Sequence, residues 1–243
     1  MISFEACTNS KSPARFFKYI SYKLGFAKEH PNYFYPDGLS VFVGPQGSGK
    51  TLSAVLYVEK LMSMYPQALL VTNIELTNFP FDNERVFPFN DSDDLQRYSN
   101  GEKGVIFLID EIQLYFNSLQ SKNINPEVMV QISQQRKQRK HIICTSQVFG
   151  RMAKPLREQF SSVILCKNIL GFIQVNKLVD RDSIEEYDNS TNLKGEVKKK
   201  FIWFHSPDDY KKYNTYYVID KNKFVSNEEK VVDIYDSRLS DNN

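Results

Sequence analysis

The chain has 243 residues and a mass of 28.3 kDa, which fits one α/β domain with additions or two small domains. It is 41% hydrophobic and 25% charged, with a 14% aromatic share that can fill a sizeable core, so wholesale disorder is excluded. Glycine and proline number ten each, which excludes collagen-like and low-complexity architectures. The net charge is only +2, so any affinity for nucleic acid must come from local charge.

The cysteines and the lengths of the apolar runs indicate in which cellular compartment the protein is expected. Cys7, Cys144 and Cys166 match neither a disulfide framework nor a zinc-binding spacing, which favours a reducing, cytosolic setting. No run approaches the roughly 18 apolar residues of a membrane span. The N-terminus lacks the compact apolar segment of a signal peptide. We therefore expect a soluble, intracellular protein.

Residues 1–36 form a basic, aromatic leader. Its apolar residues have roughly helical spacing, and Pro13 would lie in the first turn of a helix. The simpler interpretation is a helix packed on the main domain. The alternative is an arm that docks on a partner or on a membrane surface.

The middle of the chain alternates short apolar runs with helical patterns. We expect strands at 39–43, 68–72, 105–109, 141–145 and 163–166, and helices at 51–65 and about 125–140. Residues 73–103 look loop-rich and acidic. The alternation predicts an α/β domain over residues 37–180, with a parallel sheet covered on both faces. Residues 181–243 are expected to form a β-rich extension that ends in a polar tail.

A phosphate-binding loop follows the first predicted strand. The motif G-x-x-x-x-G-K-[ST] is matched in full by Gly44, Pro45, Gln46, Gly47, Ser48, Gly49, Lys50 and Thr51. Successive backbone N–H groups would turn around the phosphates at the start of the next helix. Lys50 would reach the β- and γ-phosphates, and the Thr51 hydroxyl would ligate Mg²⁺. The sequence therefore predicts binding of ATP with Mg²⁺.

A second signature of phosphate chemistry is the apolar strand 105–109 followed by Asp110 and Glu111. Many strands end in a solvated acid, but the upstream phosphate-binding loop gives this one a role. Asp110 would hold Mg²⁺, and Glu111 would polarise the attacking water. The adjacent glutamate favours hydrolysis over binding alone or phosphotransfer to a small acceptor.

A third feature is the strand that ends in Ser146 and Gln147. Following the acidic strand, it would bring a polar side chain to the γ-phosphate. Gln147 is our first choice for this sensor and Ser146 the second. The alternative is that the two residues only cap the strand.

The fourth feature is a basic stretch between Val128 and Arg157 that contains no acidic residue. Its seven members are Arg136, Lys137, Arg139, Lys140, Arg151, Lys154 and Arg157. The stretch would contact a phosphate backbone, supply an arginine finger to a neighbouring subunit's ATP, or be a plain solvated face. Arg136 and Arg139 are the candidate fingers because they fall on the helix predicted after the acidic strand, and Arg157 is a weaker candidate.

Another basic cluster, residues 198–200, flanks Phe201, Trp203 and His205. It predicts an edge strand in preference to an aromatic surface that binds a nucleic-acid strand. We expect a nearby group of acidic residues to form a charged loop, because the group lacks the geometry of a nuclease metal site. Its members are Asp180, Asp182, Glu185, Glu186 and Asp188.

Several short motifs together resemble one family. They are Val71-Thr72-Asn73-Ile74, Asp110-Glu111-Ile112-Gln113, Gln134-Gln135-Arg136-Lys137, Thr145-Ser146-Gln147 and Leu156-Arg157. Over roughly residues 37–180 the chain resembles the zonular-occludens-toxin-like ATPases of bacteriophages. These belong with the FtsK/HerA-like pumping ATPases in the additional-strand, RecA-like class of P-loop NTPases. The resemblance implies a homo-oligomeric ring with ATP between subunits. Filamentous-phage members act in virion assembly and export, and related viral members package double-stranded DNA.

The chain departs from the filamentous-phage pattern, because no membrane span follows its ATPase segment. The resulting hypothesis is a phage genome-packaging ATPase that translocates DNA, expected to be double-stranded, without reading its sequence. Its expected partner is a capsid or portal protein, and its expected place is the host cytoplasm and, transiently, the virion or procapsid. Two alternatives stay open: a virion-assembly ATPase acting at a membrane through another protein, and a slow NTP-dependent scaffold.

Overall fold

The computed structural model describes residues 13–31, 33–35, 37–81, 83–119, 126–184 and 195–214. Cys7, the acidic residues Glu185, Glu186 and Asp188, and the polar tail at 225–243 lie outside these residues.

The described residues form an eight-stranded sheet in the order β3-β2-β4-β5-β1-β6-β7-β8. The strands are β1 (Leu39–Val43), β2 (Leu69–Thr72), β3 (Val86–Pro88), β4 (Val105–Ile109), β5 (Lys140–Ser146), β6 (Phe160–Ile169), β7 (Ile173–Val179) and β8 (Val197–Phe204). Strands β1 to β6 pair in parallel, whereas β7 and β8 are antiparallel additions. This arrangement confirms the predicted α/β class with a mainly parallel sheet.

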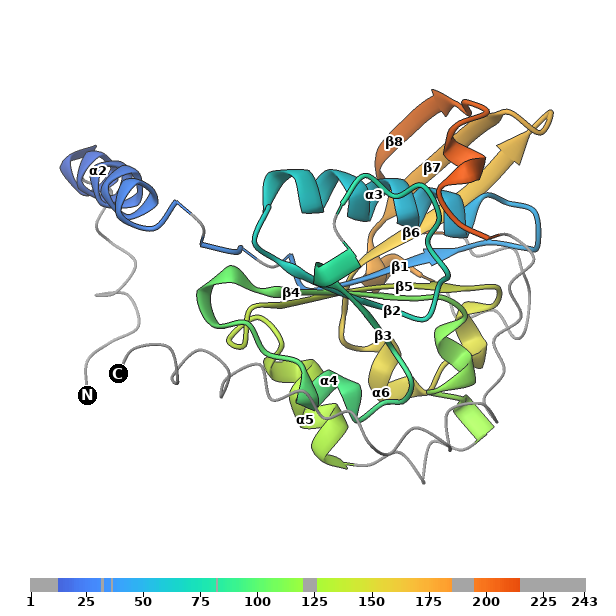
Figure 1. Cartoon of the computed structure of the whole chain (residues 1–243), viewed down its shortest axis with the longest axis horizontal. Coiled ribbons are helices and arrows are strands. Elements are labelled where there is room, and N and C mark those ends of the chain that lie inside the picture. Colours follow the sequence, from blue (N-terminus) through green and yellow to red (C-terminus); the bar gives the residue numbers. More distant parts are fainter. Residues whose placement is uncertain are drawn as a thin grey trace.

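Helices cover both faces of this sheet (Figure 1). Helix α3 (Lys50–Met64) lies on one face, and α4 (Asp94–Arg97), α5 (Pro126–Gln134) and α6 (Lys154–Arg157) lie on the other. Every residue of β1, β4 and β5 is buried, as strands covered on both faces must be. The strand that carries the acidic motif therefore runs through the middle of the domain.

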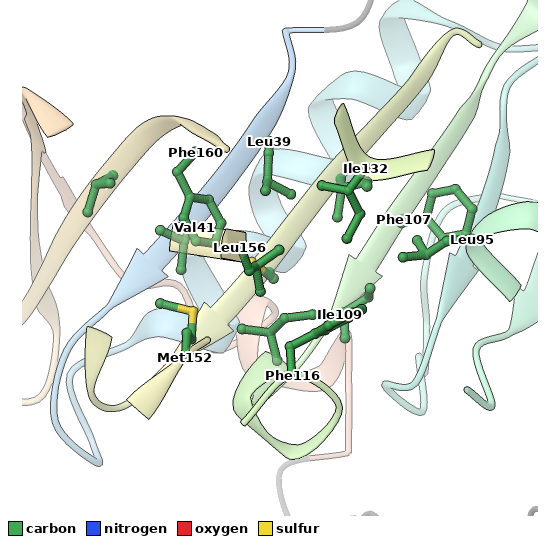
Figure 2. Close-up of a cluster of buried hydrophobic side chains, with 14 of the residues drawn as sticks. Leu39, Val41, Leu95, Phe107, Ile109, Phe116, Ile132, Met152, Leu156 and Phe160 are labelled. Atoms are coloured by element: carbon green, nitrogen blue, oxygen red, sulfur yellow. The ribbon is translucent and has the colours of Figure 1, made fainter. Parts of the chain in front are cut away.

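Two apolar clusters fill the space between the sheet and the helices. Because side chains alternate along a strand, Phe107 and Ile109 point to the α5 side, where they pack in one cluster with Ile132 (Figure 2). Leu108 points the other way and packs in the second cluster with Val55 of α3. Strand β4 is thus anchored on both sides, which fixes the position of the residues that follow it.

The helix predicted at about 125–140 ends earlier, at Gln134. The chain then turns, with the Lys140 N–H donating to the Gln135 carbonyl at 2.9 Å and Arg139 at φ +55°. The turn is needed because Lys140 already belongs to the buried strand β5, where its ammonium donates to the Leu95 carbonyl at 2.7 Å. Arg136 and Arg139 therefore lie in a turn and not on a helix, which corrects the prediction.

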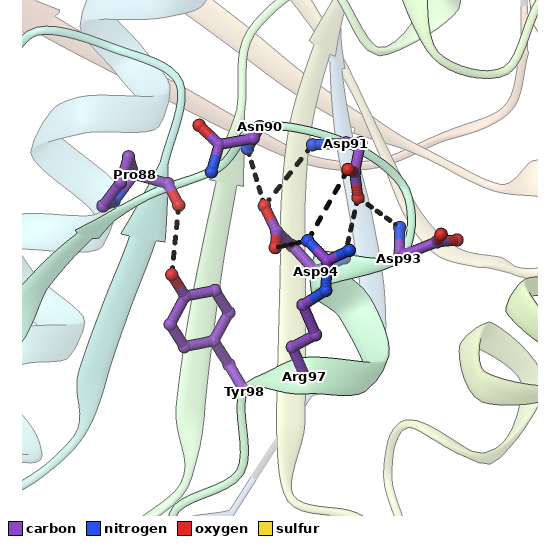
Figure 3. Close-up of polar contacts among 7 residues, drawn as sticks. All are labelled: Pro88, Asn90, Asp91, Asp93, Asp94, Arg97 and Tyr98. Atoms are coloured by element: carbon purple, nitrogen blue, oxygen red, sulfur yellow. Dashed lines mark hydrogen bonds and ion pairs between the residues drawn. The ribbon is translucent and has the colours of Figure 1, made fainter. Parts of the chain in front are cut away.

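The segment expected to be loop-rich contains β3 and the four-residue helix α4. The helix is organised by Asp94, which is only 2% exposed (Figure 3). Its carboxylate accepts hydrogen bonds from the Asn90 N–H at 2.7 Å and the Arg97 guanidinium at 3.1 Å. Burial raises the pKa of Asp94. Elements this short leave no periodic pattern in a sequence.

The two ends of the described chain differ in how they join the domain. Strands β7 and β8 extend the central sheet through pairing of β7 with β6. Helix α2 (Pro13–Glu29) confirms the helical spacing of the leader and stands apart from the sheet (Figure 1). Phe17 and Leu24 of α2 are more than 60% exposed, which favours a docking arm over a helix packed on the domain. Among the described helices, none has the length and apolar character to cross a membrane.

Buried His141 predicts a pH dependence of stability. The side chain is 1% exposed on the α3 face of β5, and burial lowers its pKa from 6.5 to about 4. Between these two values the unfolded chain binds a proton that the folded chain does not, so stability falls as the pH falls. The loss should be on the order of 2–3 kcal/mol between pH 7 and pH 4.

Urea unfolding at pH 7 and pH 4 measures this loss. A His141→Leu variant should lose much of the difference, whereas the matched variant His30→Leu, at a partly exposed histidine, should keep it. An equal pH difference in wild type and His141→Leu would contradict the assignment.

Candidate active site

The phosphate-binding loop connects β1 to α3 and owes its shape to its glycines. Gly47 and Gly49 have φ values of +75° and +78°, in the left-handed region that glycine adopts without strain. A Cβ on Gly44 would lie 2.7 Å from the Cys166 carbonyl oxygen, so that position has no room for a side chain. The Lys50 ammonium donates to the Pro45 carbonyl at 3.3 Å, so the lysine folds back along the loop.

A cleft of about 360 Å³ opens at this loop. One part of its lining is the loop and the first turn of α3: Gln46, Gly47, Gly49, Lys50, Thr51 and Leu52. The polar residues that follow β4 and β5 line it as well: Asp110, Glu111 and Gln147. The structure therefore brings together at one cleft three separate motifs of the sequence.

The centre of the cleft is a hydrogen-bonded cluster around Asp110. Asp110 Oδ1 accepts hydrogen bonds from Thr51 Oγ1 at 3.0 Å and from Thr145 Oγ1 at 2.6 Å. Burial raises the pKa of Asp110, and the bonds from the two threonines and the charge of Lys50 oppose that rise. A carboxylate and a hydroxyl on adjoining elements are the oxygen ligands that Mg²⁺ prefers. Thr51 and Asp110 thus fit the predicted metal site.

Glu111 is held in the cleft by its neighbours. Its backbone has φ +50°, and its N–H donates to Thr145 Oγ1 at 3.0 Å. Its carboxylate accepts hydrogen bonds from the side-chain amide of Gln147, at 3.0 Å, and from that of Gln113. An ionised carboxylate is a proton acceptor, so this fixed group can serve as a general base for a water in the cleft.

Asn73 and Thr145 also belong to this site, although the sequence analysis gave them no role. Asn73 Oδ1 accepts from the Asp110 N–H at 2.7 Å, and Asn73 Nδ2 donates to the Asp110 carbonyl at 3.0 Å. Thr145 bridges the Asp110 carboxylate and the Glu111 N–H. The available signal was position: Asn73 directly follows β2 and Thr145 is the next-to-last residue of β5, and these are the two strands that flank β4.

The basic stretch is not one patch, which corrects the sequence interpretation. Arg136, Lys137 and Arg139 precede β5, at the sheet edge opposite the cleft, whereas Arg151 and Lys154 follow β5. Strand β5 has seven residues and is roughly 20 Å long, with Arg136, Lys137 and Arg139 before its first residue and Arg151 after its last.

The arginines chosen as fingers lie away from the cleft of their own chain. The Arg139 guanidinium stacks over the Tyr33 ring at 4.0 Å and lies 3.6 Å from Glu102, while Arg136 is exposed. The Arg157 guanidinium lies 6.0 Å from the Phe149 ring. Action on a neighbouring subunit stays a prediction for all three.

The basic cluster at 198–200 lies on β8, which ends the order of the sheet and is thus the predicted edge strand. Lys198 forms an ion pair with Asp180 at 3.0 Å, and Arg181 pairs with Asp182 at 2.7 Å. No group of three potential metal ligands occurs among the described residues. Asp180 and Asp182, the described members of the acidic group, thus both pair with basic side chains.

The order of the central strands identifies the class of protein. Strand β5 lies between β1, which carries the phosphate-binding loop, and β4, which carries Asp110 and Glu111. One strand inserted between these two defines the additional-strand, RecA-like class of P-loop NTPases. The family model described as zonular occludens toxin (Zot) matches residues 38–202. The chain therefore belongs to the Zot family.

Solved structures with similar folds are distant in sequence. The N-terminal domain of zonular occludens toxin from Neisseria meningitidis is 16% identical, with a TM-score of 0.47 over 73% of this chain and 98% of that one. The DNA-packaging ATPase B204 of Sulfolobus Turreted Icosahedral Virus is 12% identical, with a TM-score of 0.46 over 71% and 98%. ATPases 2 and 3 of EccC from Thermomonospora curvata are 12% identical, with a TM-score of 0.42 over 67% and 37%. No curated protein matches the chain.

Thr145 provides a test of the site. A Thr145→Val change keeps the shape of the side chain but leaves the Asp110 carboxylate without one donor and the Glu111 N–H without its acceptor. We expect kcat for ATP hydrolysis to fall at least about tenfold, with ATP affinity changed less than about threefold. Thr145→Ser, which keeps the hydroxyl, should restore most of the rate. Wild-type kcat in Thr145→Val would contradict this role.

Proposed function

We propose that this chain hydrolyses ATP and works as a ring-forming motor that translocates DNA, most specifically a bacteriophage genome-packaging ATPase. The observation that supports it best is the cluster in which Thr51 and Thr145 bond Asp110 while Glu111 is fixed beside it. In this proposal the cluster supplies a metal-binding site and a general base, and both lie opposite the phosphate-binding loop. Hydrolysis of a triphosphate needs these three groups together.

Each site residue has a role in this proposal. The loop N–H groups and Lys50 bind the phosphates of ATP, and Thr51 and Asp110 hold the Mg²⁺ that accompanies it. The metal neutralises charge on the phosphates when it is bound. Glu111 accepts a proton from the attacking water. Gln147, which bonds Glu111 directly, links that carboxylate to the state of the γ-phosphate.

The translocation part of the proposal rests on the family resemblance and on charge. In a homo-oligomeric ring, ATP would lie between subunits, and Arg136 or Arg139 would complete the neighbour's site. Hydrolysis would change the interface and so move basic residues that grip the DNA phosphates. Exposed Arg136, Lys137, Arg151 and Lys154 are available for such a grip. A capsid or portal protein would anchor the ring.

Steady-state ATP turnover tests the proposal. We expect turnover that linear double-stranded DNA stimulates at about 50 mM salt and stimulates less at about 200 mM, because phosphate contacts release counterions. Glu111→Gln should lower turnover at least about a hundredfold while ATP still binds. The matched control Glu158→Gln, at an exposed glutamate at the far edge of the sheet, should leave the rate unchanged.

The outcomes separate the alternatives. Absence of turnover would contradict hydrolysis and favour a slow scaffold, and turnover that survives Glu111→Gln would contradict hydrolysis at this site. Turnover lost in Glu111→Gln but insensitive to DNA would contradict translocation and keep the ATPase.

A second candidate function is virion assembly at a membrane, and helix α2 is the observation that favours it. Phe17, Tyr22 and Leu24 are more than 60% exposed there, beside Lys18 and Lys23. Apolar side chains flanked by lysines suit the surface of an anionic bilayer.

Co-sedimentation with vesicles tests this candidate. The chain should pellet with vesicles that contain about 30% anionic lipid and not with neutral vesicles, and added salt should weaken the binding. A Phe17→Ser, Leu24→Ser double variant should lose the binding but keep ATP turnover. Equal pelleting with both kinds of vesicle, or with none, would contradict a membrane role for α2.

A further inference from the structure

The phosphate-binding loop is held from outside by a side chain of β7. Gln174 is 0% exposed, and its Nε2 donates to the Ser48 carbonyl at 2.9 Å and to Asn176 Oδ1 at 2.8 Å. Ser48 lies in the loop between two of its glycines. A side chain distant in sequence thus donates to the carbonyl of a peptide unit within the loop itself.

The contact is close enough to constrain Gly49. A Cβ on Gly49 would lie 2.1 Å from Gln174 Oε1, and the residue has φ +78°. Glycine is therefore required here both by its backbone conformation and by the side chain of Gln174. The backbone of the loop and the side-chain amide of Gln174 are therefore complementary in shape and in hydrogen bonding.

His205, just after β8, fixes the orientation of this amide. Its Nε2 lies 3.1 Å from Gln174 Oε1, and because an amide oxygen only accepts, Nε2 carries the proton. Its Nδ1 bonds the Tyr210 hydroxyl, which lies 3.0 Å from the Gly171 carbonyl oxygen. Burial lowers the pKa of His205, and the charge of Asp209 and the Gly171 carbonyl oppose that shift.

Residues 205–214 are also fastened at their far end. The Lys212 ammonium forms an ion pair with Glu59 of α3 at 2.6 Å, and the Lys212 carbonyl accepts from the Thr77 N–H at 2.8 Å. The Asn214 N–H donates to the Glu75 carbonyl at 2.9 Å. The segment thus runs from β8 past α3 to the residues after β2, and four of its side chains line the nucleotide cleft: His205, Tyr210, Tyr213 and Asn214.

We propose that Gln174 is a positioning residue for the phosphate-binding loop and that His205 fixes the orientation of its side-chain amide. It orients the Ser48 peptide so that the neighbouring N–H groups of the loop point into the cleft. The inference rests on the proposed ATPase function. It extends the nucleotide site beyond the phosphate-binding loop to β7 and to the segment after β8.

The kinetic signature follows from what the loop does. Its N–H groups bind phosphate in the ground state and in the transition state alike, so a poorly oriented loop weakens both. Gln174→Leu, which removes the amide at similar volume, should raise KM for MgATP about tenfold and leave kcat within about twofold. His205→Leu should raise KM several-fold, and His205→Gln, which retains a donor, should raise it less.

The control variant is Val175→Ala. Val175 is 7% exposed and faces the opposite side of β7, so this change loosens the same strand without touching the loop. KM for MgATP, kcat, binding of a non-hydrolysable ATP analogue with Mg²⁺, and thermal unfolding without nucleotide are measured for every variant. Val175→Ala should lower the melting temperature and keep KM within about twofold of wild type.

The results discriminate between the inference and the function on which it rests. An unchanged KM in Gln174→Leu, or an equal rise in Val175→Ala, would overturn the positioning role and leave the ATPase proposal standing. The inference would be supported if KM rises in Gln174→Leu and His205→Leu but not in Val175→Ala, and if it rises less in His205→Gln than in His205→Leu. A folded wild-type chain that binds no MgATP analogue would overturn both.

Discussion

The rest of the site depends on one buried carboxylate. Asp110 stands at the end of a strand that is buried on both faces, where an unpartnered charge would be costly. Hydrogen bonds reach its side chain from α3 and β5, through Thr51 and Thr145, and its backbone from Asn73 after β2. Three elements distant in sequence thus converge on one residue. The hydrogen bonds that stabilise the buried Asp110 carboxylate also orient it towards the phosphate-binding loop.

The sheet order makes this convergence possible. Parallel strands bring their carboxyl ends to one edge, so the residues that follow β1, β2, β4 and β5 meet there. With β5 placed between β1 and β4, Thr145 contacts both the Asp110 carboxylate and the backbone of Glu111. Gln147, two residues later, holds the carboxylate of Glu111. The inserted strand thereby contributes residues to the candidate active site.

The antiparallel strands add a second layer of support on the outer side of the loop. Gln174 of β7 bonds the loop, and residues 205–214 pass from β8 to the segment after β2. The cleft is therefore lined by residues from both halves of the sheet. In the proposed motor, this connection would make nucleotide affinity sensitive to the position of the β7–β8 hairpin.

Much of the fold and the heart of the site could be predicted, because they depend on local patterns. The apolar runs around Val41 and Phe107, and the sequence from Gly44 to Thr51, are contiguous signals of buried strands and a phosphate-binding loop. Such patterns could not predict where α5 ends or that β5 divides the basic stretch. They also could not predict the roles of Asn73, Thr145 and Gln174. Each depends on which strands lie side by side and on where a chain must turn to enter a buried sheet. Contiguous motifs were enough to establish the class of chemistry. The side chains that hold the reacting groups emerged only from the folded arrangement, because their contacts join residues far apart along the chain.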